Sequence, residues 1–264
     1  MTGPMIGVTI GVGYPYAKLA TLAATCVEEH TGLKCHVLDH THFSRSGLRH
    51  PAALRLALFD YFDHSDVLYF DADWICLNSW RPSVFAGRSN LVACRDFTLD
   101  IHYPKQDYDF SSPEFIGRPG SAFSCQEQGV QRADYCAKII AFTNVTRSCS
   151  NWLNSGLLIL NRQSHRRWLD RALALYCSTI GHHEEYFEQP ALLAALDDCG
   201  VQIDFLPRKF NVLATRIRKW PSIVTGLHVK LKHHLEFAMA VNGDTISTPD
   251  QAKDYFVENE TTQS

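Results

Sequence analysis

Asp71 and Asp73 are the residues whose spacing most clearly indicates chemistry, because they follow an almost unbroken apolar run, residues 66–70, with only Ala72 between them. In an extended chain, residues two apart point to the same side, so both carboxylates can approach one hard cation. Open α/β sheets bind ligands at the carboxyl ends of their strands. A cation held there would offset the charge on a departing nucleoside diphosphate. The alternative is a strand end capped by two turn-forming aspartates.

The elements that must position this pair follow from the apolar pattern. Apolar and β-branched segments predict strands over residues 5–13, 33–38, 66–71, 91–94, 156–160, 201–206 and 221–228. Helical spacing predicts helices over residues 17–29, 51–62, 166–179 and 190–196. This alternation of strands and helices predicts an α/β fold with a largely parallel central sheet.

The length and composition predict one packed domain over residues 1–245. The chain has 264 residues, of which 45% are hydrophobic and 20% charged, as in ordinary globular proteins. Residues 97–151 lack a clear periodicity and are too long for a simple connection, so we expect an acceptor-side insertion there. Residues 246–264 are predicted to form a polar C-terminal tail.

Charge and cysteine usage exclude some classes of partner. The net charge is −3 with scattered Lys and Arg, so we expect no nucleic-acid partner. The nine cysteines show no zinc-binding spacing, and most are expected to be buried thiols.

The sequence shows neither a secretory signal pattern nor a run of 18 apolar residues. We therefore expect a cytoplasmic protein without a transmembrane segment.

Several short segments, in a fixed order, carry a family resemblance. They are Leu54-Arg55-Leu56, residues 67–73 (VLYFDAD), residues 92–96 (VACRD), residues 154–161 (NSGLLILN), Glu188-Gln189, Leu206-Pro207 before Phe210-Asn211, and His228. With these segments the chain resembles the GT-A-fold glycosyltransferases. More narrowly, it is similar to the retaining family 8 enzymes of the glycogenin and bacterial galactosyltransferase type. The resemblance spans most of residues 5–235 and implies a single GT-A domain.

The resemblance also implies roles for particular residues. Asp71, Asp73 and His228 would hold a divalent metal, and a mixed oxygen and imidazole set suits Mn²⁺ better than Mg²⁺, the second candidate. The implied catalytic residues, around the sugar, are Asp96, Glu188 and Gln189. The implied nucleotide-sugar contacts are Arg55, Ala72, Asn154, Ser155, Lys230 and Lys232. Without the family pattern, the simpler interpretations hold: Arg55 is a solvated helix residue, Asp96 a loop cap, Asn154 a turn former and Gln189 a helix opener.

The sequence departs from the family in two places. The loop after the first strand is Gly11-Val-Gly-Tyr14, where the family has acidic and polar residues that bind the base. Thr9, Gly11 and Val12 therefore become the candidate base contacts. The family's late lysine, six residues after the histidine, is replaced by His234, so Lys230 and Lys232 are both candidates for the diphosphate.

Together these features predict a metal-dependent glycosyltransferase that transfers a hexose from a nucleotide diphosphate sugar, for which a UDP-sugar is the first candidate. The reaction is predicted to retain the anomeric configuration. The acceptor, whether a glycan, a small molecule or a protein, is not identified. An inverting enzyme would instead need a general base, for which Glu188 or Glu184 is the candidate. The alternatives are a sugar nucleotidyltransferase, an Asp-x-Asp phosphatase, and a catalytically silent module that binds nucleotide-sugars.

Overall fold

The computed structural model of the chain describes residues 4–95, 111, 113–116, 123–124, 153–178, 188–214 and 219–257. Asp96 lies outside the described residues. So does most of the predicted acceptor-side insertion, of which the structure describes a short helix, α4 (Pro113–Ile116), and a two-residue strand, β6 (Phe123–Ser124).

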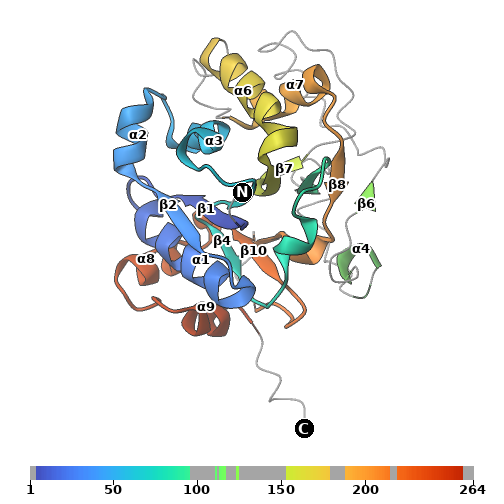
Figure 1. Ribbon diagram of the computed structural model, residues 1–264. Coiled ribbons are helices and arrows are strands. Elements are labelled where there is room, and N and C mark those ends of the chain that lie inside the picture. Colours follow the sequence, from blue (N-terminus) through green and yellow to red (C-terminus); the bar gives the residue numbers. More distant parts are fainter. Residues whose placement is uncertain are drawn as a thin grey trace.

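A seven-stranded sheet forms the centre of the described part of the chain (Figure 1). Across the sheet the strands are β2 (Cys35–Leu38), β1 (Ile6–Ile10), β3 (Asp66–Phe70), β7 (Leu153–Asn161), β5 (Leu91–Arg95), β8 (Ile203–Phe205) and β6. Strand β1 pairs in parallel with β2 and β3, and β5 pairs in parallel with β8. Strands β7 and β6 run antiparallel to their neighbours. The other strands share one direction, which confirms the predicted α/β fold with a largely parallel sheet.

A three-stranded sheet continues directly from the large one. Its strands, in order across the sheet, are β4 (Trp74–Cys76), β10 (Gly226–Val229) and β9 (Val212–Ala214). Strand β10 runs antiparallel to β4 and places His228 opposite Trp74. Only residues 71–73 separate β3 from β4, so the turn that carries both aspartates joins the two sheets.

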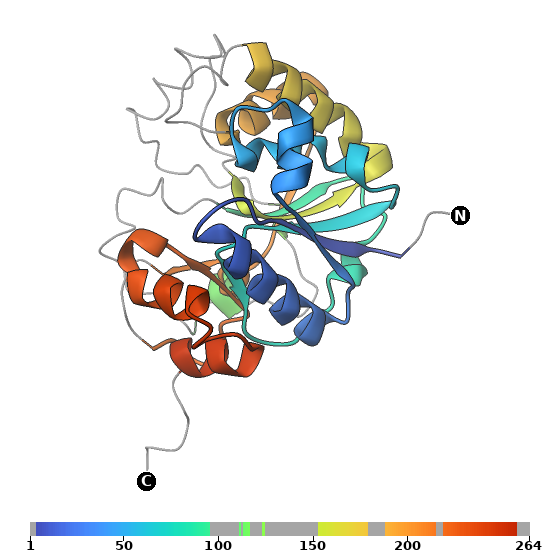
Figure 2. The same cartoon turned by 90° about the vertical axis from the view of Figure 1, so that its left-hand side faces the viewer.

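Helices cover both faces of the large sheet (Figures 1 and 2). One face packs against α1 (Tyr16–Thr31), and beyond it lie α8 (Leu235–Asn242) and α9 (Pro249–Phe256). The other face packs against the helices η1 (Pro51–Ala57), α3 (Leu58–Tyr61), α6 (Arg162–Ser178) and α7 (Gln189–Cys199), with α2 (His40–Ser46) beside them. The described residues also form short 3₁₀ turns: η2 (Pro82–Phe85), η8 (Arg208–Phe210) and η9 (Leu231–His233).

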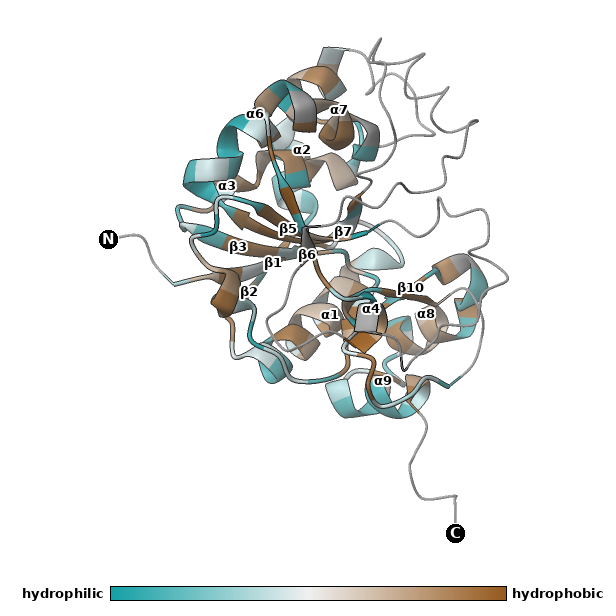
Figure 3. Ribbon diagram, turned by 90° about the vertical axis from the view of Figure 1, so that its right-hand side faces the viewer, coloured by the Kyte–Doolittle hydropathy of each residue, from teal (hydrophilic) through white to brown (hydrophobic). Residues whose placement is uncertain are grey.

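The sequence pattern accounts for this two-sided core. Strand β1 is buried along its whole length, as expected when helices cover both faces of a parallel sheet. Its residues Ile6, Val8 and Ile10 belong to one hydrophobic core, while a Cβ at Gly7 would meet Phe70 of the other. Hydrophilic residues lie on the outer face of α6 (Figure 3), and α2 buries none of its residues. Every helix in the described residues is too short or too polar to traverse a lipid bilayer.

The segment predicted as one helix over residues 51–62 is a 3₁₀ helix, η1, followed by a single α-helical turn, α3. Pro51 suits the first turn, and the His50 imidazole accepts a hydrogen bond from the Ala52 backbone N–H at 3.2 Å. Arg55 is buried within this segment, so the interpretation of Arg55 as a solvated helix residue is wrong.

The polar tail predicted for residues 246–264 is wrong for its first part. Residues 246–257 pack onto the core beside α1, with Ile246, Ala252, Phe256 and Val257 buried. A capping box starts α9: Thr248 accepts from the Gln251 N–H, and the Gln251 side chain accepts from the Thr248 N–H. Burial at residues 249, 252 and 256 follows helical spacing, so the mainly polar composition conceals one apolar face. Residues 258–264 lie outside the described residues.

Candidate active site

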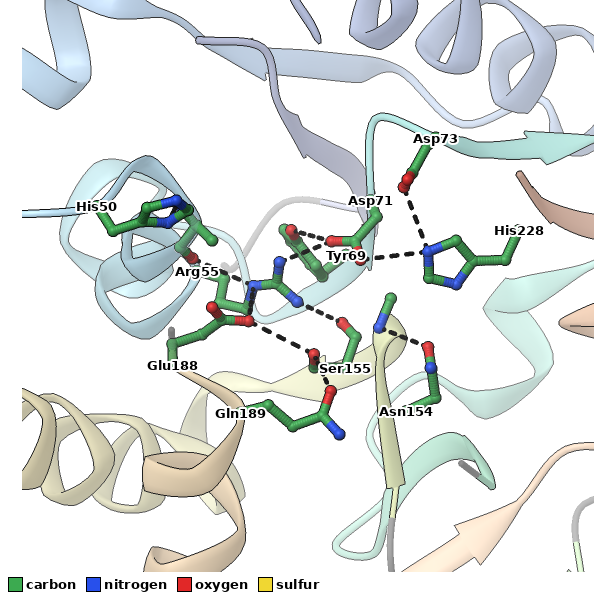
Figure 4. A network of polar contacts seen from close by, with 12 residues as sticks. His50, Arg55, Tyr69, Asp71, Asp73, Asn154, Ser155, Glu188, Gln189 and His228 are labelled. Carbon is green, nitrogen blue, oxygen red and sulfur yellow. Dashed lines mark hydrogen bonds and ion pairs between the residues drawn. The ribbon is translucent and has the colours of Figure 1, made fainter. Parts of the chain in front are cut away.

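The two aspartates and His228 converge where the two sheets meet. The Asp71 N–H donates to the Gly156 carbonyl at 2.9 Å, and the Val229 N–H donates to the Asp73 carbonyl at 2.7 Å. The backbone of each sheet therefore fixes one aspartate. His228 Nε2 lies 3.2 Å from Asp73 Oδ1 and 3.8 Å from Asp71 Oδ2 (Figure 4). We call these three residues the cation cluster.

The cation cluster has the donor set and the spacing of a divalent-metal site. One ligand atom from each residue lies within 4.8 Å of the others. Two carboxylate oxygens and one imidazole nitrogen suit Mn²⁺ and related divalent ions. Burial raises the pKa of the Asp73 carboxyl, but His228 and Lys230 outweigh burial and hold this pKa below its ordinary value. Asp73 is therefore ionised and able to act as a ligand at neutral pH.

Gly156 leaves the space that the side chains of the cation cluster occupy. A Cβ at this position would lie 2.7 Å from His228 Cε1 and 2.9 Å from Asp71 Oδ2. These distances are shorter than van der Waals contacts, so only glycine fits without displacing the cluster. Gly156 belongs to the first part of β7, where the register between β5 and β7 shifts between Ala93 and Cys94. Such an irregularity re-aims the strand, and here it brings residues 154–156 to the site.

Arg55 connects the cation cluster to α7. Its guanidinium lies 2.7 Å from Asp71 Oδ1 and 3.0 Å from Glu188 Oε1, and it also donates to the Ser155 carbonyl at 2.9 Å (Figure 4). Burial lowers the pKa of Arg55, but Asp71 and Glu188 outweigh it and raise this pKa above its ordinary value. Arg55 is therefore a permanent positive charge between two carboxylates.

The described residues that the resemblance implies for sugar binding lie beside this ion pair (Figure 4). Ser155 Oγ donates to Gln189 Oε1 at 3.0 Å and lies 3.5 Å from Glu188 Oε1. Asn154 Oδ1 accepts from the Gly156 N–H at 3.0 Å within the irregular first part of β7, so the interpretation of Asn154 as a turn former is wrong. Gln189 begins α7, as its simpler interpretation requires.

All these side chains line one cavity of about 500 Å³, a volume within the usual range for small-molecule sites. The predicted residues that line it are Val12, Arg55, Asp71, Ala72, Asp73, Asn154, Ser155, Glu188, Gln189, His228 and Lys230. Thr9 and Gly11 do not line it: Thr9 is fully buried, and a Cβ at Gly11 would contact Ala20 and Val37. The side chain of Lys232 and all of Asp96 lie outside the described residues.

The cavity has four further aromatic and imidazole side chains that the sequence analysis did not assign: Tyr14, Tyr16, His50 and Tyr69. Tyr14 and Tyr16 are 76% and 41% exposed, which is unusual for large rings and could have been suspected from their place after a Gly-containing loop. Burial and the nearby Asp73 and Asp71 raise the pKa of Tyr16. Tyr69 is buried under Arg55 and carries no local sequence signal that separates it from a core residue.

By sequence, the chain matches no family model and no curated protein. Solved structures share its fold. The galactosyltransferase LgtC, in complex with donor and acceptor sugar analogs, matches with a TM-score of 0.54 at 16% identity, over 91% of this chain and 96% of LgtC. An active-site mutant of LgtC matches with a TM-score of 0.53 at 16% identity, over 97% and 98% of the two chains. The bifunctional glycosyltransferase WbbM matches at 0.50 and 13% identity, over 82% of this chain and 41% of WbbM.

The fold and these matches define the class: the described chain has the GT-A fold of glycosyltransferases. Both LgtC structures are covered over nearly their whole length, which confirms the predicted resemblance to galactosyltransferases as a resemblance of fold.

Proposed function

We propose that this protein is a metal-dependent glycosyltransferase that transfers a hexose, with retention, from a nucleotide diphosphate sugar, with a UDP-sugar as the first donor to test. The observation that carries the proposal is the convergence of Asp71, Asp73 and His228 in the cavity of a GT-A fold. The likeness to LgtC, which was solved with donor and acceptor sugar analogs, supports it.

Asp71, Asp73 and His228 would hold a Mn²⁺ or Mg²⁺ ion, which when bound supplies Lewis-acid stabilisation of the departing diphosphate. Lys230 lines the same cavity, and its ammonium can pair with a diphosphate oxygen. Tyr14 and Tyr16 offer exposed ring faces against which a base can stack. Asn154, Ser155 and Gln189 present amide and hydroxyl groups that can bind sugar hydroxyls, and we assign Asp96 to the same sugar pocket.

The surroundings of Glu188 support retention over inversion. Burial and the nearby Asp71 raise the pKa of Glu188, while Arg55 opposes this effect. Its Oε1 is held by Arg55 and faces Ser155 Oγ. A raised pKa makes a carboxylate a stronger base, but the ion pair with Arg55 occupies Oε1, so this oxygen is poorly placed to take a proton from an acceptor hydroxyl. Glu184, the other candidate base, lies outside the described residues. A retaining reaction needs no such base, because a diphosphate oxygen can take the proton.

The first test is a thermal-shift comparison of UDP-hexoses with Mn²⁺ and with EDTA. A ligand that binds only the folded state stabilises it by about 2.7 kcal/mol at a hundredfold excess over its Kd. We expect this gain with Mn²⁺ and its loss with EDTA. An equal shift in EDTA would contradict a metal-dependent donor site.

The second test separates turnover from binding. A glycosyltransferase releases the nucleoside diphosphate from its donor, and NMR of the product or hydrolysed sugar reports whether the anomeric configuration is retained. Pyrophosphate release from a nucleoside triphosphate and a sugar phosphate would instead indicate a nucleotidyltransferase. Metal-dependent donor binding without any release of nucleoside diphosphate would indicate a silent binding module.

A further inference from the structure

The two oxygens of Asp71 have different surroundings. Oδ1 accepts hydrogen bonds from Arg55 Nη2 and from the Tyr69 hydroxyl, both at 2.7 Å. Oδ2 lies on the other side, 3.8 Å from His228 Nε2 and 2.9 Å from the position that a Cβ on Gly156 would occupy. One oxygen is therefore bound by the protein, while the other faces the space that the cation cluster encloses (Figure 4).

Strand geometry brings Tyr69 to this position. Tyr69 and Asp71 are two residues apart at the end of β3, so their side chains point to the same side. The Arg55 guanidinium carbon lies 4.7 Å above the centre of the Tyr69 ring, which places the ring under the cation and the hydroxyl at the carboxylate. Tyr69 and Arg55 are 1% and 5% exposed, so water competes little for either hydrogen bond.

Arg55 is itself held from several sides. It donates to the Ala52 carbonyl at 3.2 Å and to the Ser155 carbonyl at 2.9 Å, and it pairs with Glu188 at 3.0 Å. Glu188 thus supplies a second negative charge, and Arg55 does not depend on Asp71 alone for neutralisation. The two donors on Oδ1 are fixed before any cation binds.

We propose that Tyr69 is a positioning residue that, together with Arg55, holds Asp71 so that Oδ2 alone is presented to the cation. The proposal rests on the metal site of the proposed function and deepens it. Side chains that hydrogen-bond to a metal ligand commonly fix the ligand's rotamer and change the affinity of the site for the metal. Tyr69 would not bind the ion itself. Its hydroxyl would act through Asp71.

The competing interpretation is that Tyr69 is a core aromatic whose hydroxyl merely needs a partner. The ring does belong to the hydrophobic core under η1 and α6. The two interpretations differ in one measurable respect. A structural hydroxyl contributes to folding stability with or without metal, whereas a positioning hydroxyl changes the affinity for the cation.

Tyr69→Phe separates them, because it removes the hydroxyl and keeps the ring. Mn²⁺ would be titrated alone into the full chain, with free Mn²⁺ followed by electron paramagnetic resonance and the metal-free melting temperature measured in EDTA. We expect the Kd for Mn²⁺ to rise about tenfold. Tyr61→Phe is the matched control, since Tyr61 lies on α3 with its ring against His42, and it should leave the Kd unchanged.

Arg55→Lys provides a second variant, which keeps the positive charge. One ammonium cannot reproduce the guanidinium contacts to Asp71, Glu188 and Ser155, so we expect a weaker Mn²⁺ affinity here as well. An unchanged Kd in both variants, whatever happens to the metal-free melting temperature, would overturn the positioning role and leave the metal site intact. Absence of Mn²⁺ binding to the wild-type chain would overturn the proposed function and this inference together.

Discussion

At the scale of single residues, the asymmetry of Asp71 predicts that its amide variant is more damaging than that of Asp73. In Asp71→Asn, the Arg55 and Tyr69 donors both require an acceptor, so the amide oxygen turns toward them and the NH₂ group faces the cation. An NH₂ group offers no lone pair to a metal. In Asp73→Asn, the amide oxygen can remain on the side that faces His228 and the rest of the cation cluster, so it can still act as a ligand.

We therefore expect Asp73→Asn to weaken Mn²⁺ binding by about tenfold and Asp71→Asn by at least about a hundredfold, a further difference of about 1.4 kcal/mol. Calorimetric titration of both variants with Mn²⁺ measures this difference. Equal losses would show that the amide at position 71 keeps its oxygen toward the metal.

The sequence alone predicted only those site residues whose role is evident from their spacing along the chain. The spacing of Asp71 and Asp73 at a strand end is enough to predict a shared ligand. His228 is one of 13 histidines, and only the ordered family resemblance indicated it. Tyr69 could not be assigned, because an aromatic residue in an apolar strand fits a core position equally well. Its contact with Asp71 becomes evident only in three dimensions.

At the scale of elements, α9 carries a prediction about stability. Phe256 is 1% exposed and packs its ring against Phe237 of α8, with centroids 4.7 Å apart. We expect Phe256→Ala to lower the free energy of unfolding by about 3–5 kcal/mol, since it removes a large buried ring and leaves a cavity.

Urea unfolding followed by circular dichroism tests this expectation. Met239→Ala is the control, because Met239 lies on the adjacent α8 but is 66% exposed, and it should change the stability by less than about 0.5 kcal/mol. If Phe256→Ala were as mild as the control, α9 would not contribute to the core of the protein in solution.

The elements differ in how well the sequence predicted them. The helix α1 was predicted nearly to its ends, because its apolar spacing is regular and Gly32 ends it in a left-handed conformation. Strand β7 begins at Leu153, upstream of the predicted 156, since Asn154 and Ser155 are polar residues buried by the site rather than by the core. The 3₁₀ winding of η1 was missed because it keeps a spacing close to that of an α-helix over so short a segment.

At the scale of the whole molecule, buried thiols set a limit on alkaline stability. Burial raises the pKa of Cys76 to about 12, and burial with a smaller contribution from Glu28 raises the pKa of Cys35 to about 12. An unfolded chain loses these protons above about pH 8.5. Between that pH and 12 the native state therefore binds more protons than the unfolded state, so stability falls as the pH rises.

Each such thiol lowers the free energy of unfolding by about 1.4 kcal/mol per pH unit in this window. Cys76→Ala should therefore show a slope that is less steep by about this amount, measured by urea unfolding under reducing conditions between about pH 9 and 10.5. Cys177→Ala removes an exposed thiol and should keep the wild-type slope. A Cys76→Ala slope equal to the wild type would mean that Cys76 is accessible to solvent base in the native state.

The order of the strands was beyond the sequence analysis. A largely parallel sheet follows from the alternation of strands and helices, but the insertion of β7 between β3 and β5 depends on long-range pairing. The same holds for the pairing of β10 with β4, which brings residues 73 and 228 together across more than half of the chain. Periodicity reports which face of a strand is buried, and it carries no information about the neighbouring strand.

The passage of the chain from the large sheet to the small one has a mechanical consequence. Asp71 and Asp73 stand on the turn between the sheets, whereas His228 comes from the middle of the small sheet. An ion bound by all three would cross-link segments far apart in the sequence, much as a zinc ion fastens a small zinc-binding domain. Metal binding would then restrict the movement of the two sheets relative to each other, and a chelator would remove this restraint.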